Sequence, residues 1–248
     1  IPRVLTEYAS HRTGHITIDV INSTTTHRAA LNPVTMLGDE LPPLRRPNFL
    51  AIVTLHVLAD YLNRDPEIRP DGFIVEGPTA GGHSSPPRGK VALDEAGDPI
   101  YGPRDNADLE KIARVGLPFW LAGGFASPEK VAEARAAGAA GVQTGTLFAL
   151  ADESGLTQDL RSQLHAELDA GTLVVRNDPR ASPTGFPFKV AQLPGTLSEE
   201  PVYQERERIC DLGYLRMPVE REDKSITYRC PSEPLTPYLR KGGTEEET

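Results

Sequence analysis

The stretch LPFWLAGGFASPEKVAEARAAGAAGVQTGTLFAL, residues 117–150, decides the fold because it contains two buried strands separated by one helix. Residues 118–122 and 141–144 are apolar runs of strand length, and glycine follows both of them. Between the strands, Ser127 stands at an N-cap position, a proline follows it, and Gly138 stands where the helix should end. Strands that are apolar on both faces and alternate with helices indicate a parallel sheet covered by helices.

The same alternation runs through the preceding residues. Two further apolar strands are predicted at 49–54 and 72–76, and each precedes a helical pattern. The second of these helices lies near 105–116, with Asp105 or Asn106 as its N-cap. Four strand-helix units are half of an eight-stranded barrel, and a complete open doubly wound sheet is the alternative.

The glycines favour the barrel. No G-x-G-x-x-G motif opens a helix, as a dinucleotide-binding fold would require. Instead, glycines follow three successive strands, at Gly81–Gly82, Gly123–Gly124 and Gly145. In a barrel these strand ends converge on one face, where active sites form and a phosphate commonly binds. We therefore predict an α/β fold that is the second half of a TIM-type (β/α)8 barrel, with about four parallel strand-helix units.

The last third of the sequence has a different composition. Residues 171–248 are rich in proline, glycine and charge, and they lack a sustained period. We expect an irregular C-terminal extension of loops and short elements there, with a disordered end at 241–248. The predicted domains are therefore a partial barrel at 1–170 and this extension at 171–248.

The overall composition excludes several classes of protein. A net charge of −9 over 248 residues argues against a nucleic-acid partner. No apolar run is long enough for a membrane span and no signal peptide is evident, so we expect a cytoplasmic protein with no membrane partner. Cys210 and Cys230 are expected to be two thiols, because one pair cannot complete a zinc site, and no metal is predicted. The chain opens on Ile1-Pro2 without methionine, which is expected of a fragment.

Two glycine motifs in consecutive units suggest an anion site. Gly123 and Gly124 allow a ligand to approach the backbone closely, while Gly145 and Thr146 offer N–H groups and a hydroxyl at the start of a helix. Either motif alone also suits an ordinary tight turn between a strand and a helix. Their occurrence in consecutive units favours a phosphate cradle.

The motif Gly81-Gly82-His83 adds a basic side chain at the end of another strand. The glycines leave space in which a flat ring can lie against the backbone, and a histidine suits general-base chemistry near neutral pH. A solvated loop histidine explains the local sequence equally well.

The segments DGFIVEGPTAGGH (71–83) and PFWLAGGFASPEKVAEARAAGAAGVQTGTLFAL (118–150) resemble the nitronate monooxygenase family, formerly called 2-nitropropane dioxygenases. These are flavin-dependent (β/α)8 barrels related to the flavin enoyl-acyl carrier protein reductases. The resemblance covers about residues 49–155, with three motifs in order. It implies FMN as cofactor and His83 as the base or the group that orients the substrate. The implied cofactor-binding residues lie beside the ring (Gly81, Gly82) and at the phosphate (Gly123, Gly124, Gly145, Thr146).

The resemblance also implies a reaction. The leading expectation is an FMN-dependent oxidoreductase that carries out oxidative denitrification of nitronates or nitroalkanes, with a small-molecule substrate and O2 as partners. Two alternatives stay open: a flavin-dependent enoyl-thioester reductase on the same barrel, and a catalytically silent half-barrel fragment. A half-barrel also presents an open sheet edge, through which self-association is expected.

Other polar residues have two interpretations each. Glu76 lies on the strand before the glycines and either points into the barrel or pairs with Arg88 or Lys90. In the segment 178–189, Arg180 or Lys189 either lies near an anionic group or belongs to a plain surface loop.

Overall fold

The computed structural model describes residues 1–178, 181, 186–210 and 216–247. Within them the chain divides into two compact units, each described here by itself. The first unit comprises Ile1–Leu50, Tyr61–Asp71 and Arg208–Thr248, and the second comprises Ala51–Asp60 and Gly72–Glu207. All the site residues predicted from the sequence fall in the second unit.

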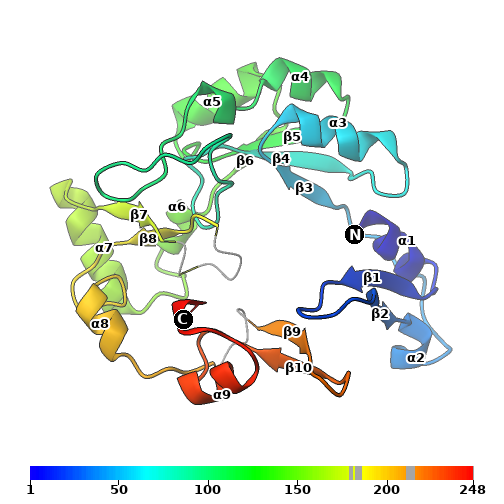
Figure 1. Ribbon diagram of the computed structural model, residues 1–248. Helices are drawn as coiled ribbons and strands as arrows, with labels where there is room; N and C mark the ends of the chain where they lie inside the picture. Colours follow the sequence, from blue (N-terminus) through cyan, green and yellow to red (C-terminus); the bar gives the residue numbers. More distant parts are fainter. Residues whose placement is uncertain (179–180, 182–185, 211–215, 248) are drawn as a thin grey trace. The chain divides into compact units, whose positions relative to one another are not determined.

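The second unit is organised around a four-stranded sheet (Figure 1). Its strands are β3 (Leu50–Val53), β4 (Gly72–Glu76), β5 (Phe119–Ala122) and β6 (Gly141–Gln143), adjacent in that order. The pairs β4–β5 and β5–β6 are parallel. The predicted α/β class and strand positions are thereby confirmed, while the assignment to half of a barrel stays a prediction.

Helices alternate with these strands. They are α3 (His56–Arg64), α4 (Leu109–Arg114), α5 (Pro128–Ala136), α6 (Thr146–Ala149) and α7 (Gln158–Ala170). At α5 the local signals hold as predicted, because Ser127 Oγ accepts a hydrogen bond from Lys130 N at 3.3 Å and Gly138 follows the helix at φ +88°.

The predicted cap of α4 is wrong. Asp108, rather than Asp105 or Asn106, caps the helix by accepting from Lys111 N at 3.1 Å. The Asp105 carboxylate is already engaged in the preceding 3-10 turn η1 (Pro103–Asp105), where it accepts from the backbone N–H of Gly102 and of Arg88, each at 2.7 Å.

One face of the sheet forms the core of the second unit. The register aligns Phe73 with Phe119 and Val75 with Leu121, and all four side chains are at most 4% exposed. Burying each of these side chains contributes roughly 1.5–3 kcal/mol. Helices α3, α4 and α5 run along one side of the sheet (Figure 1), and each supplies one buried residue: Ala59, Ile112 and Ala134. The strands that lead to the candidate site are thus fixed by a layer of buried side chains between the sheet and these helices.

The second unit continues into two short strands and a helix. β7 (Val175–Asn177) pairs antiparallel with β8 (Lys189–Ala191), and α8 (Glu200–Glu205) follows. In the loop between β4 and α4, Leu93 and Pro99 form an isolated antiparallel bridge.

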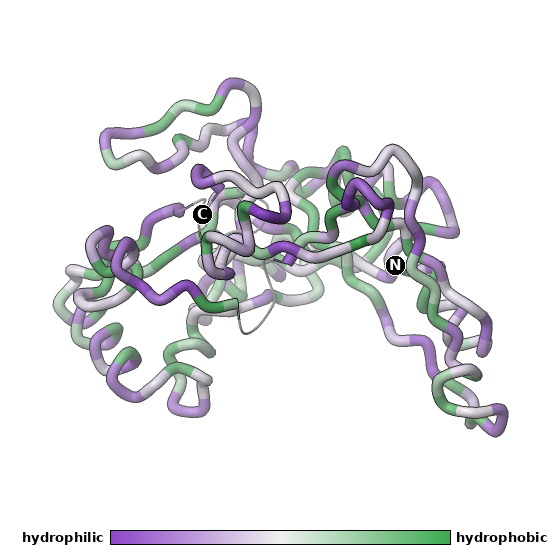
Figure 2. The backbone as a smooth tube through the Cα atoms, turned by 60° about the horizontal axis from the view of Figure 1, so that its bottom comes forward, coloured by the Kyte–Doolittle hydropathy of each residue, from purple (hydrophilic) through white to green (hydrophobic). Residues whose placement is uncertain are grey.

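The first unit contains two antiparallel strand pairs. Its elements are α1 (Pro2–Ala9), β1 (Gly14–Ile18), β2 (His27–Leu31), α2 (Pro33–Leu37), β9 (Met217–Glu220), β10 (Ile226–Arg229), α9 (Leu235–Arg240) and η3 (Glu245–Glu247). β1 pairs with β2 and β9 with β10. Figure 2 shows that the hydrophobic segments of the chain are short and separated by hydrophilic turns. In the described part of the chain no helix is both long and apolar enough to cross a membrane.

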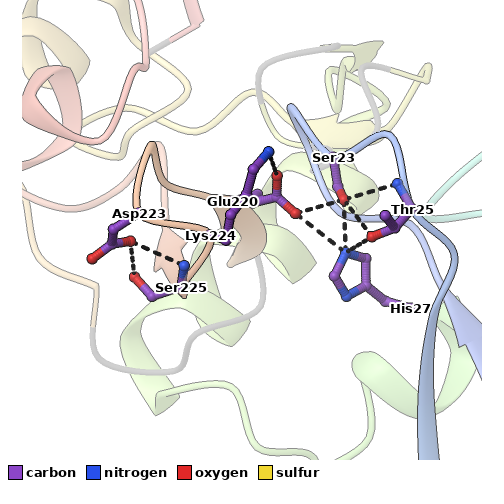
Figure 3. A network of polar contacts seen from close by, with 7 residues as sticks. All are labelled: Ser23, Thr25, His27, Glu220, Asp223, Lys224 and Ser225. Carbon is purple, nitrogen blue, oxygen red and sulfur yellow. Dashed lines mark hydrogen bonds and ion pairs between the residues drawn. The ribbon is translucent and has the colours of Figure 1, made fainter.

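A polar network joins the two strand pairs of the first unit (Figure 3). Ser23 Oγ donates to Glu220 Oε2 at 2.8 Å and lies 2.7 Å from His27 Nε2. These residue types occur in hydrolytic triads, but here the carboxylate contacts the serine instead of the histidine Nδ1 that a triad requires. The network therefore connects the β1–β2 turn to β9 and lacks the arrangement of a triad.

The end of the chain is ordered within the described residues, contrary to the disorder expected at 241–248. Tyr238 is fully buried, and its hydroxyl donates to Glu247 Oε2 at 2.8 Å. Arg229 donates to Gly242 O from the same cluster. Burial, and then the hydrogen bond to Glu247, raise the pKa of Tyr238 to about 12. The Tyr238 ring, packed against Gly243, thus gives this end of the chain a small core of its own.

Candidate active site

The loops after β4 and β5 touch at Gly123. A Cβ built on Gly123 would lie 2.7 Å from Ala80 N and 2.9 Å from Thr79 Oγ1. Gly123 also adopts φ +94°, a conformation that side chains disfavour. Both constraints require glycine, so the AGG motif after β5 serves the packing of the two loops as well as any ligand.

The predicted glycines and Thr146 lie close together at this end of the sheet. A Cβ on Gly81 would lie 3.5 Å from Thr146 Oγ1, and one on Gly124 would lie 3.8 Å from Thr79 Oγ1. Gly145 precedes Thr146, and no atom lies within 4 Å of its Cβ position. The structure therefore brings together the loops that follow β4, β5 and β6.

These loops offer unused donors. Among the described residues, no protein acceptor binds the backbone N–H of Gly124, Gly145 or Thr146. Gly145 also has a structural task as the N-cap of α6, where its carbonyl accepts from Phe148 N and Ala149 N at 3.0 Å. Free N–H groups, a threonine hydroxyl and open space are a donor set that fits a phosphate group.

His83 lies at the carboxyl end of β4, with an exposed side chain. Its ring meets the Phe188 ring edge to face, with centroids 4.8 Å apart and planes at 89°. The two residues also form an isolated antiparallel bridge. On either side of His83, Gly82 O accepts from Lys189 N at 3.0 Å and Ser84 N donates to Pro187 O at 2.8 Å.

Lys189 is a residue whose position the sequence left open. Its ammonium donates to Pro78 O at 2.7 Å and to Ser84 Oγ at 2.8 Å, so it does not lie on a plain surface loop. Burial lowers the pKa of Lys189, while the carboxylates of Glu76 and Asp98 act in the opposite direction. Arg180, the other predicted cation, lies outside the described residues.

Glu76 is half-buried at the last position of β4. Burial raises the pKa of Glu76, and the positive charges of Lys189 and His83 partly oppose that change. Glu76 lines a small cavity of about 10 Å3, together with Tyr101 and Arg88. Arg88 donates to Thr54 Oγ1 at 3.3 Å, so the described contacts of Arg88 do not include the predicted pair with Glu76.

A larger cavity opens beside the same loops. It has a volume of about 620 Å3, which falls in the range of small-molecule sites. Residues from the β4 and β5 ends and from the segment 101–109 line it, among them Thr79, Tyr101, Leu109, Gly123 and Phe125. Sequence reasoning missed Tyr101 and this cavity, because the residues that line it come from segments with no shared pattern.

A comparison of the sequence with models of protein families shows to which family the chain belongs. The model of one family, described as "nitronate monooxygenase", matches residues 45–183, more than half of the chain. The chain belongs to the nitronate monooxygenase family. This match agrees with the resemblance that the three glycine motifs indicated.

One curated protein is similar over part of its length. It is the (3aS,4S,5R,7aS)-5-hydroxy-7a-methyl-1-oxo-octahydro-1H-indene-4-carboxyl-CoA dehydrogenase of Mycobacterium tuberculosis (strain ATCC 25618 / H37Rv). The two sequences are 32% identical over 121 residues, which are 48% of this chain and 29% of the relative. The match thus spans less than a third of the relative.

Proposed function

We propose that this chain is the carboxyl-terminal half of an FMN-dependent barrel enzyme that oxidises nitroalkanes or nitronates with O2. The supporting observation is the convergence of Gly81, Gly124 and Thr146 at one end of a parallel sheet, with His83 on the same loop as Gly81. Membership of the nitronate monooxygenase family adds independent support.

The residues present fit a flavin mononucleotide. Gly124, Gly145 and Thr146 would bind the phosphate through N–H groups that have no protein acceptor among the described residues. Gly81 and Gly82 would lie beside the ring, where missing side chains permit close approach. When bound, FMN supplies the chemistry that takes electrons from the substrate and passes them to O2.

His83 is proposed as the general base. A nitroalkane is a carbon acid, and an imidazole nitrogen of His83 would remove the proton from the carbon next to the nitro group. The exposed ring can meet a substrate, and it packs in a T-shaped arrangement with the Phe188 ring. The positive charges of Lys189 and His83 both lower the pKa of Glu76, which places the three side chains near one another.

A second candidate is the dehydrogenation of a coenzyme A thioester. The curated relative is named as a carboxyl-CoA dehydrogenase, which favours this reaction over the reduction of an enoyl thioester. A carbon next to a thioester carbonyl is also a carbon acid, so the same base would serve. Anaerobic mixing separates the candidates, because only the true substrate class bleaches the oxidised flavin; a colourless purified chain would instead support the silent fragment.

The test of the proposed roles compares two variants. His83→Ala should retain bound flavin and lower turnover of neutral nitroalkanes by roughly 10²–10⁴-fold, the range for losing a general base. Preformed nitronate should be affected less, because its proton is already gone. Gly145→Val should instead lose flavin, since its side chain would fill the open space at the phosphate site. Loss of flavin in His83→Ala, or equal slowing of both substrate forms, would exclude His83 as the base.

A further inference from the structure

One side chain holds both ends of the loop that carries His83. Lys189 Nζ donates to Pro78 O at 2.7 Å and to Ser84 Oγ at 2.8 Å, across 111 and 105 residues of sequence. The two acceptors lie at the start and the end of the segment 78–84. A single ammonium group therefore joins the ends of the loop that contains Gly81, Gly82 and His83.

The backbone of the same segment continues this attachment. Lys189 N donates to Gly82 O at 3.0 Å, and Ser84 N donates to Pro187 O at 2.8 Å. These bonds flank His83 on both sides, and the Phe188 ring lies against its imidazole between them. Residues 187–189 thus act as a short strand that pairs with the loop.

The burial of Lys189 requires these acceptors. Ser84 is only 5% exposed, and burial lowers the pKa of the Lys189 ammonium. A partly buried ammonium is unfavourable unless its N–H groups find acceptors, and two of its three donors are placed on this loop. The carboxylates of Glu76 and Asp98 provide the balancing charge.

The loop needs such an attachment because of its glycines. Gly82 adopts φ +71°, and two consecutive glycines give the free loop many accessible conformations. A general base works only when it stays within hydrogen-bond reach of the proton it removes, and a displacement of about 1 Å can lower the rate 10²-fold.

We propose that Lys189 is a positioning residue, whose ammonium joins Pro78 to Ser84 and thereby keeps His83 at the carboxyl end of β4. It acts through the loop and does not touch substrate. The effect on catalysis rests on the proposed function of His83, whereas the ordering of the loop does not.

Hydrogen exchange tests the ordering of the loop without flavin or substrate. In Lys189→Met, the hydrogen-bonded amides of this loop, those of Ala80 and Ser84, should exchange roughly 10- to 100-fold faster, the range for losing hydrogen bonds to a charged group. Exchange in α5 should stay unchanged. Lys90→Met is the matched control, because Lys90 is exposed and makes no described contact. Unchanged exchange in 78–84 would overturn the proposal.

A second variant shows whether the effect passes through Ser84. Ser84→Ala removes one of the two acceptors, so it should raise exchange in 78–84 by a smaller factor than Lys189→Met. The double variant should exchange no faster than Lys189→Met alone, because the residues act through one shared bond. Fully additive effects would overturn this route.

Turnover then tests the link to His83. Lys189→Met should lower kcat for a neutral nitroalkane roughly 10- to 100-fold with little change in KM or flavin content. Combined with His83→Ala, it should cause no further loss, a result that general destabilisation would not give. An equal loss in both backgrounds would overturn the positioning role. If His83→Ala alone retained full activity, the proposed function would fail, while faster loop exchange in Lys189→Met would still support Lys189 as the residue that orders the loop.

Discussion

Gly123 is predicted to be the glycine of the candidate site at which replacement by alanine costs the most stability. The new Cβ would lie 2.7 Å from Ala80 N and 2.9 Å from Thr79 Oγ1, so the loops after β4 and β5 would have to move apart. Overpacking of this kind costs about 1–3 kcal/mol, and a side chain at φ +94° costs about 1–3 kcal/mol more. The expected loss of stability is therefore about 2–6 kcal/mol.

Two other glycines serve as matched controls. Gly116 has φ +82° with no atom within 4 Å of its Cβ position, so Gly116→Ala should lose only the backbone strain of about 1–3 kcal/mol. Gly145 has φ −116° and an equally open Cβ position, so Gly145→Ala should change stability by less than about 0.5 kcal/mol. Gly123→Ala thus combines backbone strain with steric overlap, Gly116→Ala has the strain alone, and Gly145→Ala has neither.

Urea unfolding followed by tryptophan fluorescence measures these differences. The chain has one tryptophan, Trp120, and it lies on β5 within the affected unit. With a denaturant slope of about 1–3 kcal/mol per M, a difference of 2 kcal/mol between Gly123→Ala and Gly116→Ala moves the midpoint by roughly 1 M. Equal midpoints for these two variants would refute the argument that the two loops are in direct contact at Gly123.

Two pH-dependent contributions are expected in the first unit. Burial opposes ionisation of Asp71, but hydrogen bonds from Phe49 N at 2.7 Å and Arg46 at 2.8 Å prevail, and the pKa of Asp71 is lowered from 3.8. Its stabilising effect is therefore present above pH 3.8 and lost as the pH falls through the folded pKa. Asp71→Asn should thus lose about 1–3 kcal/mol at pH 6 and less at pH 2 in urea titrations. A constant difference between these pH values would contradict this. The pKa of Tyr238 is raised from 10.0 to about 12, so its contribution is complete below pH 10 and lost as the pH rises through about 12. Thermal unfolding of Tyr238→Phe should lack this alkaline decline, and an identical decline in both proteins would show that another group is responsible.

The sequence by itself determined the elements whose signals lie within a few residues of each other. Ser127 caps α5 by a bond to an amide three residues later, and Gly138 ends the helix through its own φ angle. Such interactions need no distant partner, so the four strands and α5 were predictable from local pattern. Glycines after consecutive strands also indicated one site, because parallel strands end at the same edge of a sheet. The cap of α4 escaped this reasoning, since the Asp105 carboxylate is used by Arg88, 17 residues away.

Only the tertiary structure decided what surrounds the site. Lys189 reaches Pro78 across 111 residues, and no periodicity or spacing in either segment indicates that contact. The close approach of Gly123 to Ala80 likewise depends on how two loops pack. The physical reason is that a local pattern reflects only backbone preference and burial. The acceptors that a buried ammonium needs, and the atoms that leave no space for a Cβ, come from distant parts of the chain. The residue types of the candidate site were thus readable in the sequence, whereas the hydrogen bonds of Lys189 to the loop that contains His83 were not.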